Sequence, residues 1–221
     1  MGMNYNPKAS TDGLIVSLDA SNVKSYSGSG STWYDVSGNG RNASLSSSTF
    51  TSAGAESYFR FSGSGNATVS SFSKSTLNQM TMEVVYMSSS GDTFSTYGRI
   101  VDRGDTTISL GTASTYQLRM WTYAGGSRSG EIQLNGIGQD GKWHHLVYTY
   151  NGSNVTLYLD GVYQNNVAKT GNLENPMPIV LGNGDGYVFS GRIAMFRYYE
   201  NGFTAAQVQQ NFQALRGRFG I

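Results

Sequence analysis

The sequence predicts an all-β protein built from antiparallel strands, and three observations carry that prediction. Between 142 and 164, polar and apolar side chains alternate in two successive runs, which is the period of a β-strand. Asn-Gly-Ser-Asn at 151–154 separates the runs, and Asp-Gly at 160–161 is the dipeptide that a type I′ hairpin favours. The chain also holds 29 glycines, 15 tyrosines and 10 phenylalanines, which suit many short turns and aromatic-rich strands.

Length and composition set the organisation. A chain of 221 residues fits one sandwich, since such domains reach about 200–250 residues. We expect an N-terminal arm at 1–12 and a single domain at 13–221 that includes a C-terminal helix at 205–215. The net charge of +1, without a basic stripe, argues against nucleic acid as a partner. No apolar run could span a membrane, the N-terminus lacks the apolar core of a signal peptide, and cysteine is absent.

The alternation places the strands in order along the chain. The first is expected at 13–19, with Leu14, Val16 and Leu18 on one face. In the alternating run at 57–65, Phe59 and Phe61 point inward. Further strands are expected at 66–70, 80–87, 106–110, 116–121, 131–134, 179–182 and 190–199, with a strand followed by a loop within 98–105 and a flexible loop at 123–130.

The last element is a helix with a complete start signal. Thr-Ala-Ala-Gln at 204–207 is a capping box, and Phe203 with Val208 can form the hydrophobic staple that accompanies it. Gly217 is expected to terminate the helix. A narrow apolar stripe must pack on another element, and it comprises Val208, Phe212 and Leu215.

The segment 33–43, Trp-Tyr-Asp-Val-Ser-Gly-Asn-Gly-Arg-Asn-Ala, has two interpretations. Asp35 can accept hydrogen bonds from the backbone of the Ser-Gly-Asn-Gly turn, whose glycines supply left-handed residues. Alternatively, Asp35 and Asn39 hold a calcium ion together with loop carbonyls. A single carboxylate supplies few of the oxygen ligands that calcium needs, so the sequence favours the structural turn. We expect that no cofactor is required, and calcium is the one ion that the sequence leaves as an alternative.

Several of these segments resemble laminin-G-like domains of the concanavalin A-like lectin/glucanase superfamily. The run at 143–152, followed by Leu-Tyr-Leu-Asp-Gly at 157–161, is similar to their central meander, and 33–43 matches their Trp-x-Asp-x-Ser-Gly-Asn-Gly signature. The strand at 80–87 corresponds to one in which Tyr86 replaces the usual tryptophan, and a buried tyrosine hydroxyl needs a partner. The resemblance implies a two-sheet antiparallel jelly-roll sandwich of the kind that binds glycans or proteins.

The segment 210–221 closely resembles the C-termini of laminin-G-like structural proteins from tailed bacteriophages. This resemblance implies a non-enzymatic virion protein that decorates or cements the exterior of the capsid, neck or tail and that can bind glycans. The alternative is a receptor-binding, lectin-like adhesin that recognises host surface glycans. The expected partners are other virion proteins, host glycans and further copies of the chain in a symmetric assembly. Localisation in the virion, after assembly in the host cytoplasm, fits the missing signal peptide.

Titratable residues give no catalytic constellation. His144 and His145 are neighbours on a strand, so they point to opposite faces and cannot bind one metal together. His145 matches a histidine that the family places after its tryptophan, and we interpret it as structural. Glu83 has the opposite parity to its apolar neighbours and is expected to be partly exposed. The family's glucanases carry a Glu-x-Asp-x-x-Glu motif, and none of the following residues stands in one: Glu56, Glu83, Glu131, Glu174 and Glu200.

A ligand site is expected on the loops at one rim of the sandwich, because loops on a rigid scaffold carry function. An aromatic platform beside carboxylates and amides would suit a glycan. Ordinary solvated loops are the competing interpretation, which the frequency of Asp, Asn and Gly in turns favours. The candidate glycan-binding residues are Asp102, Arg103, Asp105, Tyr123, Asn183, Asp185 and Tyr187.

Overall fold

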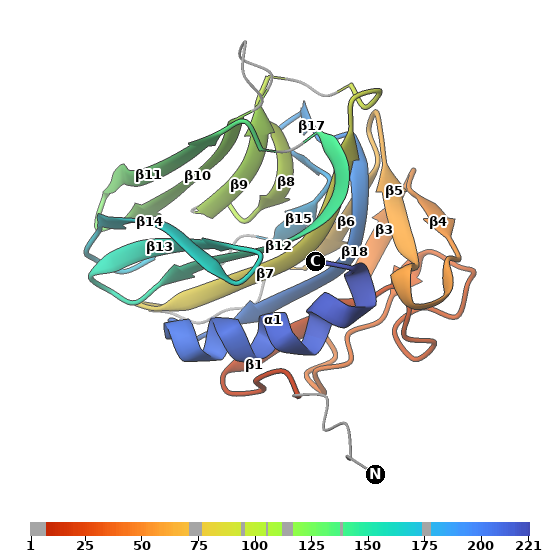
Figure 1. Ribbon diagram of the computed structural model, residues 1–221, viewed down its shortest axis with the longest axis horizontal. Helices are drawn as coiled ribbons and strands as arrows, with labels where there is room; N and C mark the ends of the chain where they lie inside the picture. Colours follow the sequence, from red (N-terminus) through yellow and green to blue (C-terminus); the bar gives the residue numbers. More distant parts are fainter. Residues whose placement is uncertain are drawn as a thin grey trace.

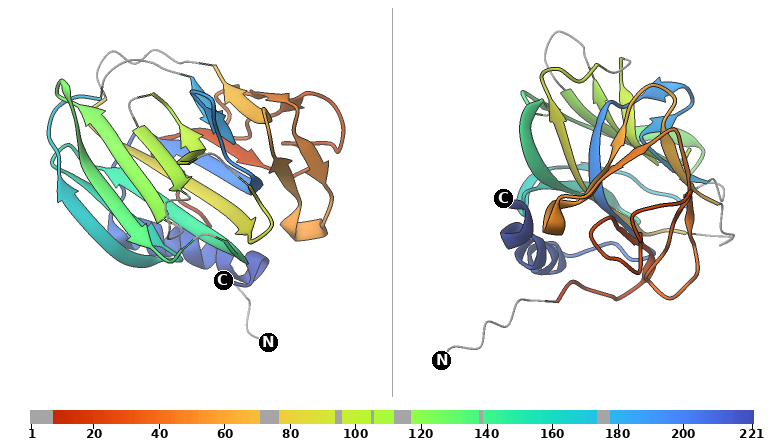
Figure 2. Two further views of the ribbon diagram at one scale, coloured as in Figure 1. Left: turned by 90° about the horizontal axis from the view of Figure 1, so that it is seen from above. Right: turned by 90° about the vertical axis from the view of Figure 1, so that its right-hand side faces the viewer.

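The computed structural model describes residues 8–70, 77–93, 96–104, 106–111, 117–137, 139–173 and 178–221. Two antiparallel sheets lie face to face, and one helix lies under the lower sheet (Figure 1). The view from the right-hand side in Figure 2 shows the same three layers. The predicted all-β sandwich with a short C-terminal helix is therefore confirmed.

The sheet beside the helix, called here the helix-side sheet, has the strand order β14-β13-β12-β7-β18-β5-β4, with β1 also paired to β18. β7 from the middle of the chain lies between β12 and the late strand β18, the interleaving expected of a jelly roll. The strands are β1 (Leu14–Asp19), β4 (Thr49–Thr51), β5 (Tyr58–Phe61), β7 (Met80–Ser89), β12 (Asp140–Tyr150), β13 (Asn154–Leu159), β14 (Val162–Ala168) and β18 (Gly191–Tyr199).

The second sheet, called here the open sheet, has the order β11-β10-β9-β8-β15-β6-β3-β2. A small hairpin of β16 (Asn183–Gly184) and β17 (Tyr187–Val188) follows β15, and a short 3-10 helix, η1, spans Gly54–Glu56. The strands are β2 (Thr32–Trp33), β3 (Ala43–Ser46), β6 (Asn66–Val69), β8 (Gly98–Asp102), β9 (Thr106–Gly111), β10 (Gln117–Ala124), β11 (Ser127–Asn135) and β15 (Ile179–Leu181).

The main core fills the space between the two sheets. Phe59 and Phe61 point into it, as the alternation predicts. Tyr86 also lies in this core, but its hydroxyl makes no hydrogen bond within the described residues, so the expected partner is missing. Asp160 and Gly161 both have positive φ, 50° and 74°, which confirms the predicted type I′ turn between β13 and β14.

The helix α1 (Ala205–Phe219) packs on the outer face of the helix-side sheet. Its capping box is formed, and Phe203 and Val208 pack in one cluster, so the predicted start is confirmed. The predicted end is wrong. The helix continues through Gly217 to Phe219 and stops at Gly220, which has a φ of 67°. Phe219 extends the apolar stripe by one turn beyond Leu215, and its burial outweighs the cost of about 1 kcal/mol for a glycine inside a helix.

Covering this outer face also buries Glu83, so its predicted partial exposure is wrong. The carboxylate is fully buried and accepts hydrogen bonds from His145 Nε2 at 2.7 Å, Asn211 Nδ2 at 3.0 Å and the Tyr199 hydroxyl at 3.1 Å. Arg197 Nη1 lies 3.3 Å away. The structural role predicted for His145 is confirmed by its bond to Glu83.

Two further expectations fail for local reasons. A bulge in β1 between Leu14 and Val16 breaks the alternation, so Val16 and Leu18 face the main core while Leu14 packs on the helix side. The segment 123–130 is not a flexible loop. Gly125 and Gly126 have φ of 57° and 75° and close a tight hairpin between β10 and β11.

The Glu83 contacts make a prediction about acid stability. Burial raises the pKa of Glu83, but the charge of Arg197 and the hydrogen bonds from His145 and Tyr199 outweigh it and lower the pKa to about 2. A depressed folded-state pKa stabilises the fold above the unfolded value of 4.5, and this stability is lost as the pH falls from 4.5 towards 2. The shift corresponds to roughly 3 kcal/mol.

We expect urea unfolding between pH 6 and pH 2.5 to show that loss in the wild type. Glu83→Gln should be less stable at pH 6 and should have a flatter pH profile. The control is Asp12→Asn, which also replaces a carboxylate by an amide but at an exposed position, and it should leave the profile unaltered. An unchanged profile in Glu83→Gln would contradict the assignment.

Candidate functional site

The outer face of the open sheet carries a stack of alternating aromatic rings and guanidinium groups. Arg99 Cζ lies 4.4 Å from the ring centroid of Trp121 and 4.9 Å from that of Tyr187. On the other side of Trp121, Arg128 Cζ stands 4.3 Å from the same ring. We call Tyr187, Arg99, Trp121 and Arg128 the cation–aromatic column. Each such contact stabilises by about 0.5–2 kcal/mol, depending on its desolvation.

Strand register and one bulge bring the column together. Asp102 pairs with Thr107 and Thr107 with Trp121, so these three residues form one row across β8, β9 and β10. A bulge between Arg99 and Val101 places both Ile100 and Val101 in the core. Because a bulge reverses the facing of the residues beyond it, Asp102 shares the outer face with Arg99.

The hairpin β16–β17 brings Tyr187 to the column. It packs against β8 at Gly184, where a Cβ would lie only 2.2 Å from Asp102 Oδ2. Glycine therefore permits the close approach. Asp102 is itself engaged, because its Oδ1 accepts hydrogen bonds from Gly104 N at 2.9 Å and from the Thr107 hydroxyl at 3.0 Å.

Arg99 is held by stacking on two aromatic rings and by an ion pair with Asp102. Its side chain is mostly buried, and Nε and Nη1 have no hydrogen-bond partner within the described residues. The acid beside it, Asp102, places Oδ2 3.9 Å from Nε. Burial lowers the pKa of Arg99, and the charges of Asp102 and Asp185 act in the opposite direction.

The structure gathers most of the predicted glycan-binding residues around this column. Asp102, Asn183, Asp185 and Tyr187 belong to β8 and to the hairpin, and Tyr123 is the next outward residue of β10 after Trp121. Arg103 is different: it is buried, and its guanidinium lies 5.4 Å from the ring of Tyr198 in the main core. Asp105 lies outside the described residues.

Sequence reasoning missed Arg99, Trp121 and Arg128. Arg99 and Trp121 lie on strands, whereas the site was predicted on loops. The outward parity of Trp121 relative to Leu118 and Met120 was a signal that could have found it.

The Asp35 segment has the hydrogen bonds of a structural turn. The Asp35 carboxylate accepts hydrogen bonds from Ser17 N, Ser37 N and Arg41 N, and from the Ser37 hydroxyl. The amide of Asn39 donates to the carbonyls of Leu14 and Ile15, so it presents N–H groups inward and not a cation ligand. In the described part of the chain, no group of three or more His, Cys, Asp or Glu is arranged to hold a metal ion.

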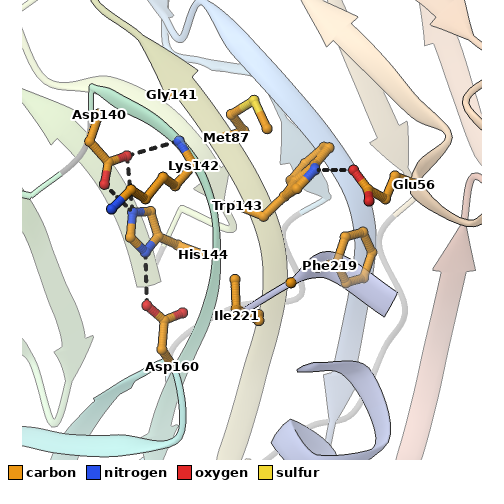
Figure 3. A pocket seen from close by; sticks show the side chains of 11 residues that line it. Glu56, Met87, Asp140, Gly141, Lys142, Trp143, His144, Asp160, Phe219 and Ile221 are labelled. Carbon is orange, nitrogen blue, oxygen red and sulfur yellow. Dashed lines mark hydrogen bonds and ion pairs between the residues drawn. The ribbon is translucent and has the colours of Figure 1, made fainter. Parts of the chain in front are cut away.

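A pocket of about 400 Å³ lies between β12, η1 and the end of α1 (Figure 3). Trp143 donates from Nε1 to Glu56 at 3.1 Å and packs on Phe219. His144 stands between two carboxylates: its Nδ1 is 2.9 Å from Asp160, and its Nε2 is 3.3 Å from Asp140. His144 and His145 point to opposite faces, as predicted. The three carboxylates thus already bind groups of the pocket wall.

Comparison with known sequences now adds the family. The sequence profile of the concanavalin A-like lectin/glucanases superfamily matches residues 61–209. The chain belongs to this superfamily. No curated protein matches the sequence. Within the described residues, no helix has both the length and the hydrophobicity needed to cross a membrane.

The similar solved structures include binding domains of toxins and a domain of an arabinanase. The binding domain of Paraclostridial Mosquitocidal Protein 1 superposes with a TM-score of 0.70 at 16% identity, and that of Botulinum Neurotoxin DC in complex with SialylT with 0.69 at 15%. The two superpositions cover 91% and 93% of the present chain, respectively. The present chain spans only 52% of the length of each of those two chains. Domain 4 of AbnA, a GH43 extracellular arabinanase from Geobacillus stearothermophilus, in complex with arabinotriose, superposes with 0.66 at 16% identity, covering 90% of this chain and 97% of that one.

The contacts of His144 in the pocket make a prediction about its pKa that NMR can test. Burial lowers the pKa of His144, but hydrogen bonds and charges from Asp160 and Asp140 outweigh it, so the pKa is raised above 6.5. In Asp160→Asn, the pKa of His144 should fall, because the larger of the two favourable charges is gone. The measurement is a proton NMR titration of the two imidazoles, assigned with His144→Gln.

Asp185→Asn is the matched control, since Asp160 and Asp185 both occupy turns with positive φ, 50° and 51°. The pKa of His144 should not change in that variant. An equal decrease in both variants would show that the pocket carboxylates do not set it.

Proposed function

We propose that this chain is a non-enzymatic glycan-binding module whose binding surface is the face carrying the cation–aromatic column. The observation that carries the proposal is the exposed aromatic surface on rigid strands: Tyr187 is 41% and Tyr123 is 37% exposed. A sugar ring can pack its C–H face on such a ring, while its hydroxyls bind neighbouring charged groups. Sites built on strands hold this geometry better than sites on loops.

The pocket near Trp143 supports glycan binding less well. Trp143 is almost fully buried, so it offers little platform, and the pocket's carboxylates are engaged by His144 and by the indole. The fold relatives favour binding in general, since they include a domain bound to arabinotriose and a toxin binding domain bound to SialylT. The lack of catalysis is part of the proposal. Asp102, the buried carboxylate at the column, is committed to Gly104 and Thr107 and is not placed to act as an acid or nucleophile.

We further propose that the module is carried on the outside of a tailed-bacteriophage particle, bound to other virion proteins in a symmetric array. The phage-like segment at 210–221 supports this location. In the structure, that segment forms the buried stripe and end of α1, with Phe212, Leu215 and Phe219 packed on the sheet. Its resemblance therefore concerns how the helix docks. The alternative remains an adhesin at the tip of a fibre.

The binding surface is tested by titrating a panel of oligosaccharides against Tyr187→Ala and Tyr123→Ala. Losing one stacked ring should weaken binding roughly tenfold, the effect of about 1.4 kcal/mol. Tyr163→Ala is the matched control, because Tyr163 is exposed on the edge strand β14 of the other sheet. Equal losses in all three variants, or none, would remove this face as the site. Turnover of any saccharide would contradict the non-enzymatic assignment.

The location is tested by imaging purified particles with and without the protein. Regular density on the capsid or tail shaft, lost in the deletion, is the expected result. Density confined to fibre tips would favour the adhesin. A protein absent from particles would contradict both.

A further inference from the structure

We propose that the column selects acidic saccharides, with Arg99 binding the carboxylate of the sugar. The inference rests on the proposed function and names the ligand class of the same site. Its starting point is a charged side chain whose hydrogen-bonding capacity is not filled, although buried charged groups are normally hydrogen-bonded; the ion pair of Arg99 with Asp102 is long, at 3.9 Å. Arg99 is only 8% exposed, yet Nε and Nη1 have no hydrogen-bond partner within the described residues.

The geometry restricts what can bind Arg99. Arg99 Cζ lies 4.4 Å from the ring centroid of Trp121 and 4.9 Å from that of Tyr187, and neither ring can accept the in-plane hydrogen bonds of the guanidinium edge. An edge of planar N–H donors matches the two oxygens of a carboxylate, which is the pairing that arginine makes best. A neutral sugar hydroxyl would satisfy one donor and bring no opposite charge to the guanidinium.

None of the neighbouring carboxylates described below forms a hydrogen bond with Arg99, so a carboxylate of a ligand can do so. Asp102 Oδ1 accepts hydrogen bonds from Gly104 and Thr107. Its Oδ2 lies 3.9 Å from Arg99 Nε, which is too far for a hydrogen bond. Asp185 acts on Arg99 only through its charge and stands at the hairpin tip. Glu131 is occupied by Arg119. Arg128, on the far face of Trp121, adds a second cation to the surface.

Tyr187 completes the site as its outer wall. It belongs to a hairpin of two very short strands, and it is the most exposed member of the aromatic pair. A sugar that packs against this ring places a substituent carboxylate next to the guanidinium edge. The site therefore joins a stacking contact and a charge contact on adjacent residues.

The test uses sialylated and uronic-acid oligosaccharides, each paired with its methyl ester, together with sulfated and neutral oligosaccharides. The ester keeps the shape and removes only the charge. We expect the wild type to bind at least one free acid about tenfold or more tightly than its ester, the size of one charged hydrogen-bonded contact. Arg99→Lys, which keeps the charge but loses the planar donors, should reduce that ratio towards one.

Arg192→Lys is the matched control, since Arg192 also stands over a tyrosine ring, that of Tyr58 at 5.7 Å, in the other sheet. It should keep the full acid preference, and thermal unfolding should show both variants folded. Equal binding of acids and esters, or a preference that survives Arg99→Lys, would overturn the inference while leaving glycan binding intact. Tight binding of sulfated sugars alone would also overturn it. Binding of no saccharide would overturn the proposed function as well.

Discussion

The carboxylate of Glu83 accepts hydrogen bonds from two strands and a helix, and the rest of the architecture depends on that arrangement. His145 and Tyr199 reach it from β12 and β18, and Asn211 reaches it from α1. An unpaired charge at this depth would cost several kcal/mol, so the helix can dock only in the register that brings Asn211 to Glu83. The helix-side sheet is thereby covered on both faces. A broad strand surface remains on the outside of the open sheet, and there the cation–aromatic column lies.

Local patterns predicted the fold where a local interaction decides it. The Asp160-Gly161 turn, the capping box before α1 and the inward Phe59 and Phe61 depend on neighbouring residues, and the structure confirms each. Glu83 shows the limit of such patterns. Parity showed that its side chain faces away from the main core, but whether that side meets water depends on a helix that begins at Ala205. The alternation of side chains along one strand does not show whether a distant helix covers the outer face of the sheet.

The candidate site was predictable only in part for a similar reason. Residues of the hairpin were chosen because turns attract Asp and Asn, and β15 then brings that hairpin beside β8. The bulge at Ile100 has no signature in the sequence, yet it turns Asp102 outward and Arg103 into the core. A one-residue insertion of this kind reverses the facing of neighbouring residues, so the two adjacent candidates separate. Arg99 and Trp121 lie on strands and form the centre of the column, and the predicted hairpin residues lie beside it.

Tyr86 and Arg99 are two of the residues with buried polar atoms that have no hydrogen-bond partner within the described residues, and the two differ in charge and in position. The hydroxyl of Tyr86 lies in the main core, where replacing a tryptophan by tyrosine leaves one neutral group unsatisfied at a cost of about 1–3 kcal/mol. That cost is a matter of packing, because the hydroxyl is uncharged and lies in the core between the two sheets. Arg99 is charged, stands on a surface and is bounded by an exposed ring. A charge can recover its desolvation cost by pairing with an anion that arrives from solvent, whereas a core hydroxyl cannot. An unfilled hydrogen-bonding group is therefore a matter of packing at Tyr86, whereas at Arg99 it is the basis of the proposed binding of an anion.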